Sequence, residues 1–339
     1  MTESNPHAPN RRWGYFLLLI LVNFMWAFQY SGARIATRKL GPITVTFLPM
    51  AFATVVLGLL LIFRRRPSAE ARSGRGNAGR WVLSFLVLGI VGTGLAQFGL
   101  TSGVKRSLAS NASVITLVIP ILMALLATVL VGEKMNRLIW ISFPLAIAGV
   151  LMVSGVDWRG VHLVSGKYLV GNVLILMGCF GSAFYNAYSK RLLRLFSPLE
   201  VLVFSYIVAD VVLFVALQAH EPGLVQHLRS AGLSAWLSLL AIAVFCLTFA
   251  MLLFFWVIQR IDLTQASLSI YLLPVFGVLI STVALKEKVT GRLLIGGLLV
   301  FIATFLATTY GERKSVPQPA PAPKGSSTIS TRSNGRSEC

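Results

Sequence analysis

The sequence predicts an all-α polytopic membrane protein, with ten transmembrane helices arranged as two inverted five-helix repeats. Composition, apolar runs and an internal repeat lead to this prediction. Of the 339 residues, 56% are hydrophobic and only 12% are charged, whereas about 25% are charged in a typical soluble domain. The mean hydropathy is +0.78. Apolar runs of about 20 residues, the length at which a helix spans a bilayer, recur along the chain.

The internal repeat is clearest between residues 108–137 and 262–291. Both segments are apolar runs that open with small polar residues, carry a central proline and end in Glu-Lys. Pro120 aligns with Pro274 at a displacement of 154 residues, and the two Glu-Lys pairs align at the same displacement. Aligned polar residues and prolines are informative in a chain where apolar identities arise by chance. The pattern indicates one unit used twice.

The elements follow in order. The first apolar run, from Trp13 to Gly32, has a basic front like a signal peptide, but it exceeds the usual apolar length and lacks a small-x-small cleavage site, so we interpret it as an uncleaved span. The other predicted spans are residues 42–63, 81–101, 109–131, 138–154, 168–189, 198–217, 234–258, 264–285 and 292–310.

These spans divide the chain into regions. The predicted organisation is a cytoplasmic tail at 1–12, a first repeat at 13–155, a connecting loop at 156–167, a second repeat at 168–310 and a Pro/Ser-rich disordered tail at 311–339. Pro42 aligns with Pro198 at a displacement of 156 residues near the start of the two halves. Because each half holds an odd number of spans, tandem copies cross the membrane in opposite senses, as in many secondary transporters.

The basic residues predict the orientation. The formal charge is +19, and the positive residues lie almost wholly between the spans and in the tails, which favours a topogenic role over nucleic-acid binding. With the N-terminus inside, 19 Lys and Arg residues fall on the inner side and 11 on the outer side. This bias predicts both termini in the cytoplasm. The basic loop at 64–80 is expected to meet anionic lipid head groups.

The cysteines and histidines predict neither a metal site nor a cofactor. The three cysteines and four histidines show no CxxC or Cys/His ligand spacing, and there is no Walker sequence for ATP. The chain is therefore expected not to be an enzyme or a pump driven by ATP.

Two prolines and one acidic residue stand within the predicted spans. Pro120 and Pro274 lie about 15–18 Å along their helices, close to the bilayer midplane, where a kink either forms a hinge beside a cavity or serves packing alone. Asp210 lies about twelve residues into the seventh span, also near the midplane. It is interpreted either as a proton-coupling or cation-binding group, or as a protonated carboxyl that hydrogen-bonds between helices.

Polar and aromatic residues gather on the spans expected to face a central cavity. They are either substrate-binding residues, with amides for polar groups and aromatic rings for apolar parts, or helix–helix contacts. The candidate substrate-binding residues are Trp26, Gln29, Tyr30, Gln97, Asn111, Thr116, Tyr185, Asn186, Tyr206, Asp210, Gln265 and Tyr271. The Glu-Lys pairs at 133–134 and 287–288 form either gating ion pairs or helix caps, and capping is the preferred interpretation.

With its two five-span halves, the chain resembles the drug/metabolite transporter superfamily, in its EamA-type branch. The motif that carries this resemblance lies at Ser110 to Lys134 and at Thr264 to Lys288. In each copy a serine, Ser113 or Ser267, lies seven residues before a proline that is followed by Glu-Lys. One departure is Lys286, where the first copy has Gly132. The resemblance extends over roughly residues 13–310 and implies a ten-helix carrier whose cavity is lined by the first four helices of each half. It also implies that the fifth and tenth helices are peripheral and available for homodimer contacts.

The expected function is secondary active transport by alternating access around a midplane cavity. The resemblance implies an exporter of small metabolites such as amino acids in a bacterial inner membrane, with a small-molecule substrate, the lipid bilayer and a coupled proton as partners. Two alternatives are a polytopic membrane enzyme acting on lipids and a passive uniporter or channel-like protein.

Overall fold

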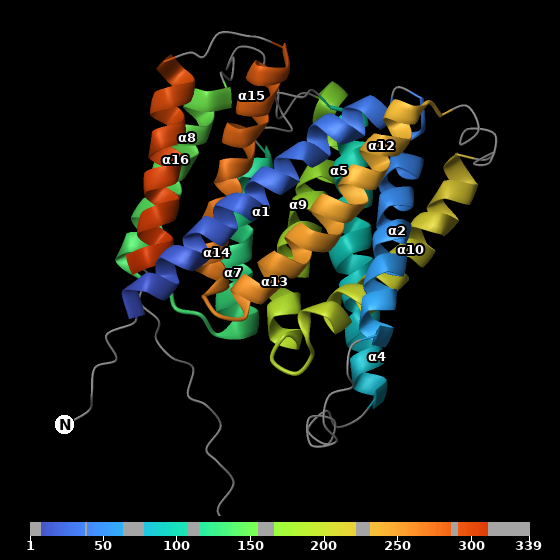
Figure 1. Cartoon of the computed structure of the whole chain (residues 1–339), viewed down its shortest axis with the longest axis horizontal. Helices are drawn as coiled ribbons and strands as arrows, with labels where there is room; N and C mark the ends of the chain where they lie inside the picture. Colours follow the sequence, from blue (N-terminus) through green and yellow to red (C-terminus); the bar gives the residue numbers. More distant parts are fainter. Residues whose placement is uncertain are drawn as a thin grey trace, which may run out of the picture.

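The computed structural model describes residues 8–37, 39–63, 78–107, 115–154, 166–221, 231–285 and 291–310. Every regular element in these ranges is helical (Figure 1). The predicted tail at 311–339 and most of the predicted connecting loop lie outside the described residues.

The first half of the chain begins with the longest helix of the protein. Its elements are α1 (Ala8–Ala36), α2 (Pro42–Phe63), α4 (Ala78–Val87), the π-helix η1 (Leu88–Gly94), α5 (Leu95–Lys105), the 3₁₀ turn η2 (Thr116–Val118), α7 (Ile119–Val131) and α8 (Arg137–Ser154).

The second half follows the same order. Its elements are α9 (Gly166–Leu192), α10 (Pro198–His220), α12 (Leu233–Ala241), the π-helix η4 (Ile242–Ala250), α13 (Met251–Ile258), α14 (Leu263–Leu268), the 3₁₀ turn η5 (Ser269–Tyr271), α15 (Leu272–Leu285) and α16 (Gly291–Tyr310). A π-helix interrupts the third helical stretch of each half, and a 3₁₀ turn lies in the fourth.

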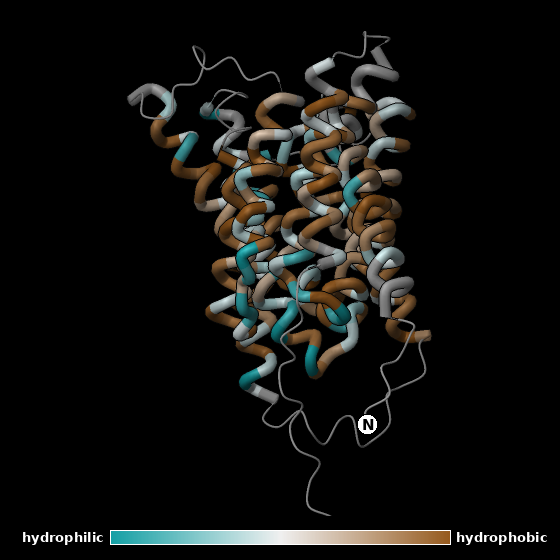
Figure 2. The backbone as a smooth tube through the Cα atoms, turned by 90° about the vertical axis from the view of Figure 1, so that its left-hand side faces the viewer, coloured by the Kyte–Doolittle hydropathy of each residue, from teal (hydrophilic) through white to brown (hydrophobic). Residues whose placement is uncertain are grey.

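Several helices have the length and composition of membrane spans. In the described residues, five stretches are long and apolar enough to cross a bilayer, and further apolar helices are shorter, at 10–17 residues. In the long span Pro42–Phe63 only 28% of the apolar window is buried inside the protein. The remaining surface of this helix is apolar as well, which suits contact with lipid and not with water. Figure 2 shows such hydrophobic residues recurring along the middle of the helices.

Local sequence explains how individual helices begin and end. Ser197 caps α10, because its side chain accepts a hydrogen bond from the amide of Glu200 while the Glu200 carboxylate accepts one from the amide of Ser197. Pro198 follows at the first helical position, where its missing N–H costs nothing. An example of a helix C-terminus is that of α7, which is capped by Gly132, whose φ of 80° favours glycine.

The packing pattern is duplicated between the halves. Helix α1 packs against η4 and α15 of the second half, and α9 packs against η1 and α7 of the first half. The helices α2 and α10 pack against each other, and α8 packs against α16 at one side of the bundle (Figure 1). Each half therefore inserts its first helix against the third and fourth helical stretches of the other half.

Close backbone approach holds α5 against α9. A Cβ atom added to Gly99 would lie 2.7 Å from the Gly178 nitrogen and from the Leu174 carbonyl oxygen. The π-helix η1 is equally tight, since a Cβ on Gly89 would lie 2.5 Å from the Val208 Cβ on α10. Small residues allow such contacts between apolar helices.

Candidate functional site

A cavity of about 200 Å³ lies between the helices of the two halves. It is lined by residues of α1, α2, η1, α5, α7, α9, α10, η4, α13, η5 and α15. Six of the candidate substrate-binding residues are among its lining residues: Trp26, Gln29, Gln97, Tyr185, Asn186 and Tyr206.

Further lining residues were not among the candidates. They are Met50, Thr93, Ala96, Leu100, Ile119, Ser182, Leu247, Met251, Ile270 and Leu273. The internal repeat of the sequence could have predicted several of them. At the displacement of 156 residues, Ser182 is the equivalent of Trp26 and Met50 is the equivalent of Tyr206, so the candidates of one half point to lining residues in the other.

The described lining of the cavity is uncharged and combines a few polar groups with apolar and aromatic side chains. Of the residues named above, none carries a formal charge at neutral pH. Asn186 donates from Nδ2 to the Ser182 carbonyl oxygen at 2.9 Å, while its Oδ1 is buried without a hydrogen-bond partner. The Thr93 hydroxyl is likewise buried without a partner. Because an unpaired buried polar group costs about 1–3 kcal/mol, these two atoms favour a ligand that supplies hydrogen-bonding groups.

Two aromatic residues of the lining are held by carbonyl oxygens of the π-helix η4. Trp26 Nε1 donates to the Cys246 carbonyl oxygen at 3.2 Å, and the Tyr206 hydroxyl donates to the Leu247 carbonyl oxygen at 3.3 Å. π-Helical turns occur frequently at functional sites. Here η4 fixes one aromatic side chain from each half beside the cavity.

Other candidates lie away from the described lining of the cavity. Asp210 bonds to Thr54 on α2. Gln265 is buried in α14 with its Nε2 unpaired, and the Tyr271 hydroxyl donates to the Leu117 carbonyl oxygen at 2.9 Å.

For three candidates the description is more limited. Thr116 is half-buried in the 3₁₀ turn η2 and is not among the lining residues. Asn111 lies outside the described residues, and the side chain of Tyr30 lies outside the described part of α1.

The two central prolines occupy matching positions beside the cavity. Pro120 is the second residue of α7, which directly follows the 3₁₀ turn η2, and Pro274 lies in the first turn of α15 after the turn η5. Their preceding neighbours Ile119 and Leu273 line the cavity, whereas the prolines do not. A proline removes one backbone hydrogen bond from a helix, and a 3₁₀ stretch in mid-helix often marks a hinge. Both features coincide here in each half.

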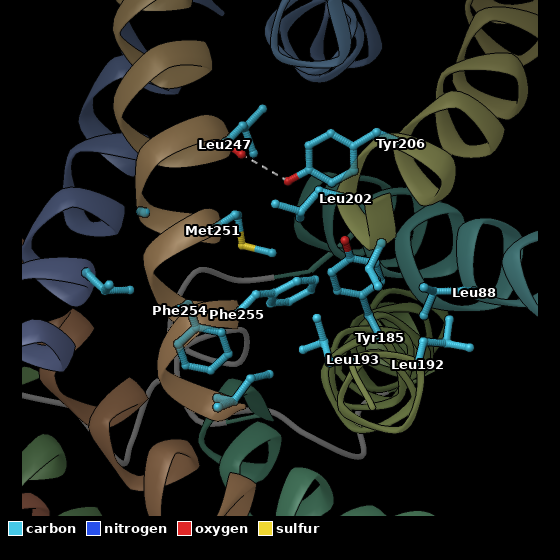
Figure 3. Close-up of a cluster of buried hydrophobic side chains, with 14 of the residues drawn as sticks. Leu88, Tyr185, Leu192, Leu193, Leu202, Tyr206, Leu247, Met251, Phe254 and Phe255 are labelled. Carbon is cyan, nitrogen blue, oxygen red and sulfur yellow. Dashed lines mark hydrogen bonds between the residues drawn. The ribbon is translucent and has the colours of Figure 1, made fainter. Parts of the chain in front are cut away.

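A packed cluster closes one side of the cavity. Along α9 the cavity residues 182–186 are followed by Leu192 and Leu193, which are almost wholly buried, and along α13 Met251 is followed by the fully buried Phe254 and Phe255. Figure 3 shows Tyr185 and Phe255 pointing toward each other from α9 and α13. This cluster separates the cavity from the end of the bundle at which α1 begins and α16 ends (the terminal end; Figure 1).

Beyond the cluster, a carboxylate fastens the two halves together at the terminal end. Glu133, directly after α7, accepts hydrogen bonds from the Leu263 amide at 2.7 Å, the Thr264 amide at 2.9 Å and the Thr264 hydroxyl at 2.8 Å. Lys190 Nζ lies 2.6 Å from Glu133 Oε1 and also donates to the Ile261 carbonyl oxygen at 2.6 Å. We call this arrangement the Glu133 clamp.

The clamp is buried and electrostatically favourable. The Glu133 side chain is 3% exposed and that of Lys190 is 12% exposed. Burial raises the pKa of Glu133, but the Lys190 ammonium and the amides of Thr264 and Leu263 outweigh burial and hold its pKa below the usual value. Glu133 caps a helix of the other half, as the preferred interpretation of the Glu-Lys pair expected, and its ion pair is with Lys190.

A related contact lies at the opposite end of the bundle. Glu221, after α10, accepts hydrogen bonds from the Ile43 amide at 2.9 Å, the Thr44 amide at 3.0 Å and the Thr44 hydroxyl at 2.8 Å. It therefore caps α2 of the first half, as Glu133 caps α14 of the second. A Cβ on Gly41 would lie 2.1 Å from the Glu221 carboxylate, so the contact requires glycine there.

A larger hollow, of about 460 Å³, lies on the surface between α2 and α12. It is lined by apolar and aromatic side chains only, among them Phe52, Val55 and Trp236. These residues are exposed on helices with the composition of membrane spans, so this hollow is a lipid-facing surface.

Comparison with known proteins identifies the family. The model of the EamA-like transporter family matches residues 12–155 and 169–309. The chain belongs to this family. It is therefore a multi-pass membrane protein of a transporter family, and the two matched segments correspond to the two halves of the fold.

Several proteins similar to this chain match it over nearly their whole length. An uncharacterized transporter of Archaeoglobus fulgidus is 21% identical, over 86% of this chain and 97% of its own. The uncharacterized transporter YoaV of Bacillus subtilis is 21% identical, over 87% and 97%. A probable terminal-alkyne amino-acid exporter of Streptantibioticus cattleyicolor is 24% identical, over 89% and 96%.

A solved crystal structure shares the fold. It superposes on the family member described here with a TM-score of 0.71, at 20% identity, over 88% of this chain and 97% of its own. In the described part of the chain, no group of three or more His, Cys, Asp or Glu side chains is placed to hold a metal ion.

Proposed function

We propose that the protein is a secondary active transporter that exports small uncharged or zwitterionic metabolites, such as amino acids, by alternating access around the central cavity. The observation that carries this proposal is the cavity itself. It lies between the two halves, its described lining is uncharged and combines polar with apolar side chains, and a packed hydrophobic cluster lies on its side toward the terminal end. The probable amino-acid exporter among the relatives supports the substrate class.

The chemistry of the lining favours a neutral or zwitterionic ligand. Asn186 Oδ1 and the Thr93 hydroxyl offer unpartnered hydrogen-bonding groups, which suit the amino group of an amino acid. Trp26 and Tyr206 provide aromatic surface for an apolar side chain, and an ammonium group is also attracted to aromatic faces. A ligand with a net charge would lack a counter-ion in the described lining, and a desolvated unpaired charge is costly.

The positions of the lining residues support an inverted repeat. Residues that are equivalent at the displacements of 156 or 154 line the cavity together in six pairs: Trp26 and Ser182, Gln29 and Tyr185, Met50 and Tyr206, Thr93 and Leu247, Gln97 and Met251, and Ile119 and Leu273. A cavity bounded by such pairs lies on a two-fold axis that exchanges the halves. This is the arrangement of an alternating-access carrier, whose site lies at the repeat interface near the midplane.

Closure of one end supports the transport mechanism. The hydrophobic cluster and the Glu133 clamp seal the terminal end, and both join elements of different halves. A rocking motion of one half against the other breaks these contacts and opens that end. The turns before Pro120 and Pro274 are suited to bend during this motion.

The membrane placement follows the distribution of basic residues. The bacterial inner membrane is the proposed location, with both termini in the cytoplasm. In this orientation the terminal end faces the cytoplasm, so the described conformation is the one closed to the cytoplasm. The peripheral pair α8 and α16 is the surface through which a homodimer would form.

Counterflow in liposomes tests the function. Liposomes that contain the protein and are loaded with unlabelled L-leucine or L-threonine are expected to accumulate the same labelled amino acid from outside. Their accumulation should exceed that of loaded liposomes without protein. L-Lysine and L-glutamate, which carry a net charge, are expected to exchange at least tenfold more slowly. No counterflow with any amino acid would refute the substrate class.

A matched pair of variants connects transport to the cavity. Thr93→Val removes the unpartnered hydroxyl of the lining, whereas Thr128→Val makes the same change on the exposed surface of α7. Thr93→Val is expected to slow counterflow about tenfold, which corresponds to the loss of one hydrogen bond. Thr128→Val should leave it unchanged. Equal effects of the two variants would place binding elsewhere.

A further inference from the structure

Asp210 on α10 and Thr54 on α2 form an isolated polar contact inside apolar helices. The Thr54 Oγ1 atom lies 2.5 Å from Asp210 Oδ2 and 2.9 Å from the Met50 carbonyl oxygen. The other carboxylate oxygen, Asp210 Oδ1, is buried and has no hydrogen-bond partner. The question is which group supplies the hydrogens for the two contacts of Thr54.

The count of protons gives the answer. A threonine hydroxyl carries one hydrogen and accepts through its lone pairs, so Thr54 cannot donate to both Met50 and Asp210. Both contacts are hydrogen bonds together only if Thr54 donates to the Met50 carbonyl and accepts from a protonated Asp210 carboxyl. The distance of 2.5 Å between Thr54 and Asp210 lies within the range of O–H···O bonds.

The position of the pair also favours a neutral carboxyl. Asp210 and Thr54 each stand twelve residues after the first residue of their helices, Pro198 and Pro42, and hence about 18 Å along them. This depth is close to the middle of a bilayer core of about 30 Å. An ionised aspartate at the centre of a membrane helix costs about 2.5–3.5 kcal/mol.

The described surroundings offer Asp210 no counter-charge in the span. Helices α2, η1 and α13, which pack against α10, carry no titratable side chain, and α4 contributes Arg80 in its first turn. On α10 itself the titratable groups are Glu200 and His220 near the ends and Tyr206 one turn away, and Tyr185 of α9 hydrogen-bonds to Ser205 of α10. Cys246 of η4, which packs against α2, donates to the Met25 carbonyl oxygen.

We propose that Asp210 is a proton-binding site that couples transport to the pH gradient. In the described conformation the carboxyl holds its proton and donates to Thr54, which fastens α10 of one half to α2 of the other. When the halves move, the carboxyl O–H bond breaks and the proton passes to water in the opened cavity, leaving Asp210 ionised. One proton is rebound when the contact re-forms.

The repeat explains why this pair responds to the motion of the halves. Thr54 and Asp210 are 156 residues apart, the displacement that relates Pro42 to Pro198, so they are equivalent positions that meet on the axis between the halves. One turn earlier on each helix, Met50 and Tyr206 line the cavity. The proton therefore lies about 6 Å along the helix from the cavity wall.

Infrared spectroscopy tests the protonation directly. Wild-type protein in lipid vesicles at pH 7 is expected to show the C=O stretching band of a protonated carboxylic acid, which disappears in Asp210→Asn. Thr54→Val, which removes the acceptor, should move the band to higher frequency, and Thr54→Ser should leave it in place. If wild type and Asp210→Asn share the same spectrum in this region, Asp210 is ionised and the proposal is wrong.

A transport measurement tests the coupling and rests on the proposed function. An imposed pH gradient is expected to accelerate wild-type uptake of labelled L-leucine at least fivefold. Asp210→Asn should lose this acceleration but retain counterflow at equal pH, because the asparagine amide keeps the bond to Thr54. A variant that still responds to the gradient would refute the coupling. Absence of any wild-type L-leucine counterflow would refute the substrate class instead, and the infrared band then decides the proton site alone.

Discussion

Replacement of Glu133 by glutamine tests whether the Glu133 clamp holds the terminal end closed. The carboxylate accepts three hydrogen bonds from Leu263 and Thr264 and neutralises the ammonium of Lys190. Glutamine keeps the shape but provides only one acceptor oxygen, and it turns an amide N–H₂ toward groups that are all donors. The substitution also leaves Lys190 without its counter-ion.

The expected cost follows from the burial of the pair. Removing one partner of a buried ion pair destabilises the paired state by about 3–5 kcal/mol. This corresponds to a ~150- to 5,000-fold shift toward the open state, at about 1.36 kcal/mol per power of ten. Hydrogen–deuterium exchange of the peptide that contains Leu263–Leu268 measures the shift, because the first two amides of this helix are held by Glu133.

Two variants control for unrelated effects. Lys134→Ala removes the exposed neighbouring charge and is expected to change the exchange by less than threefold. Glu221→Gln weakens the related contact at the opposite end. It should therefore raise the exchange of the first amides of α2 and leave the exchange of α14 unchanged. If exchange in Glu133→Gln stays within threefold of wild type, the clamp does not govern the terminal end.

The pH dependence of the clamp has a defined sign. The pKa of Glu133 is lowered in the clamped state, so the clamp stabilises that state fully above the usual glutamate range. Its contribution is lost as the pH falls through the lowered pKa. The protection factor of the first α14 amides in wild type, which corrects for the intrinsic pH dependence of exchange, should therefore fall in acid, whereas that of Glu133→Gln should stay constant across the range.

Two further predictions concern the cavity and the packing. Asn186→Leu removes the unpartnered Oδ1 of the lining and should weaken L-leucine binding about tenfold, as measured by quenching of tryptophan fluorescence; unchanged binding would exclude a contact with Asn186. Gly99→Ala places a Cβ 2.7 Å from backbone atoms of α9 and should cost about 1–3 kcal/mol, seen as a lower thermal unfolding temperature in detergent. The matched change Gly58→Ala, which meets nothing within 4 Å, should not lower it.

Much of the fold was predictable because membrane spans have a simple physical signature. Apolar runs set the positions of the helices, and α2 lies at the predicted residues 42–63. The π-helices were not predictable, since Leu88–Gly94 and Ile242–Ala250 read as ordinary helix in sequence. Both π-helices pack against the other half, and the periodicity within one segment carries no information on such contacts.

The candidate site was predictable in part. Polarity found Gln29, Gln97 and Asn186, because an amide within a span requires a partner or a cavity. Polarity alone did not distinguish a cavity from a helix–helix contact, so Tyr271, which bonds to Leu117, was grouped with them. The Glu133 clamp could not be predicted from the sequence either, because Leu263 and Thr264 lie 130 and 131 residues further along the chain.

The repeat unites the cavity with the contacts that lie outside it. Thr54 bonds to Asp210 at a separation of 156 residues and Leu117 to Tyr271 at a separation of 154, the two displacements found in the sequence. In the proposed inverted repeat, a residue touches its own equivalent only on the axis between the halves. In that arrangement both contacts lie on the axis, and the lining of the cavity consists largely of equivalent pairs. The two halves are alike in position but different in chemistry, with an aspartate in one where the other has a threonine. Under the proposed coupling, this difference would let a single proton favour one of the two directions in which the halves rock.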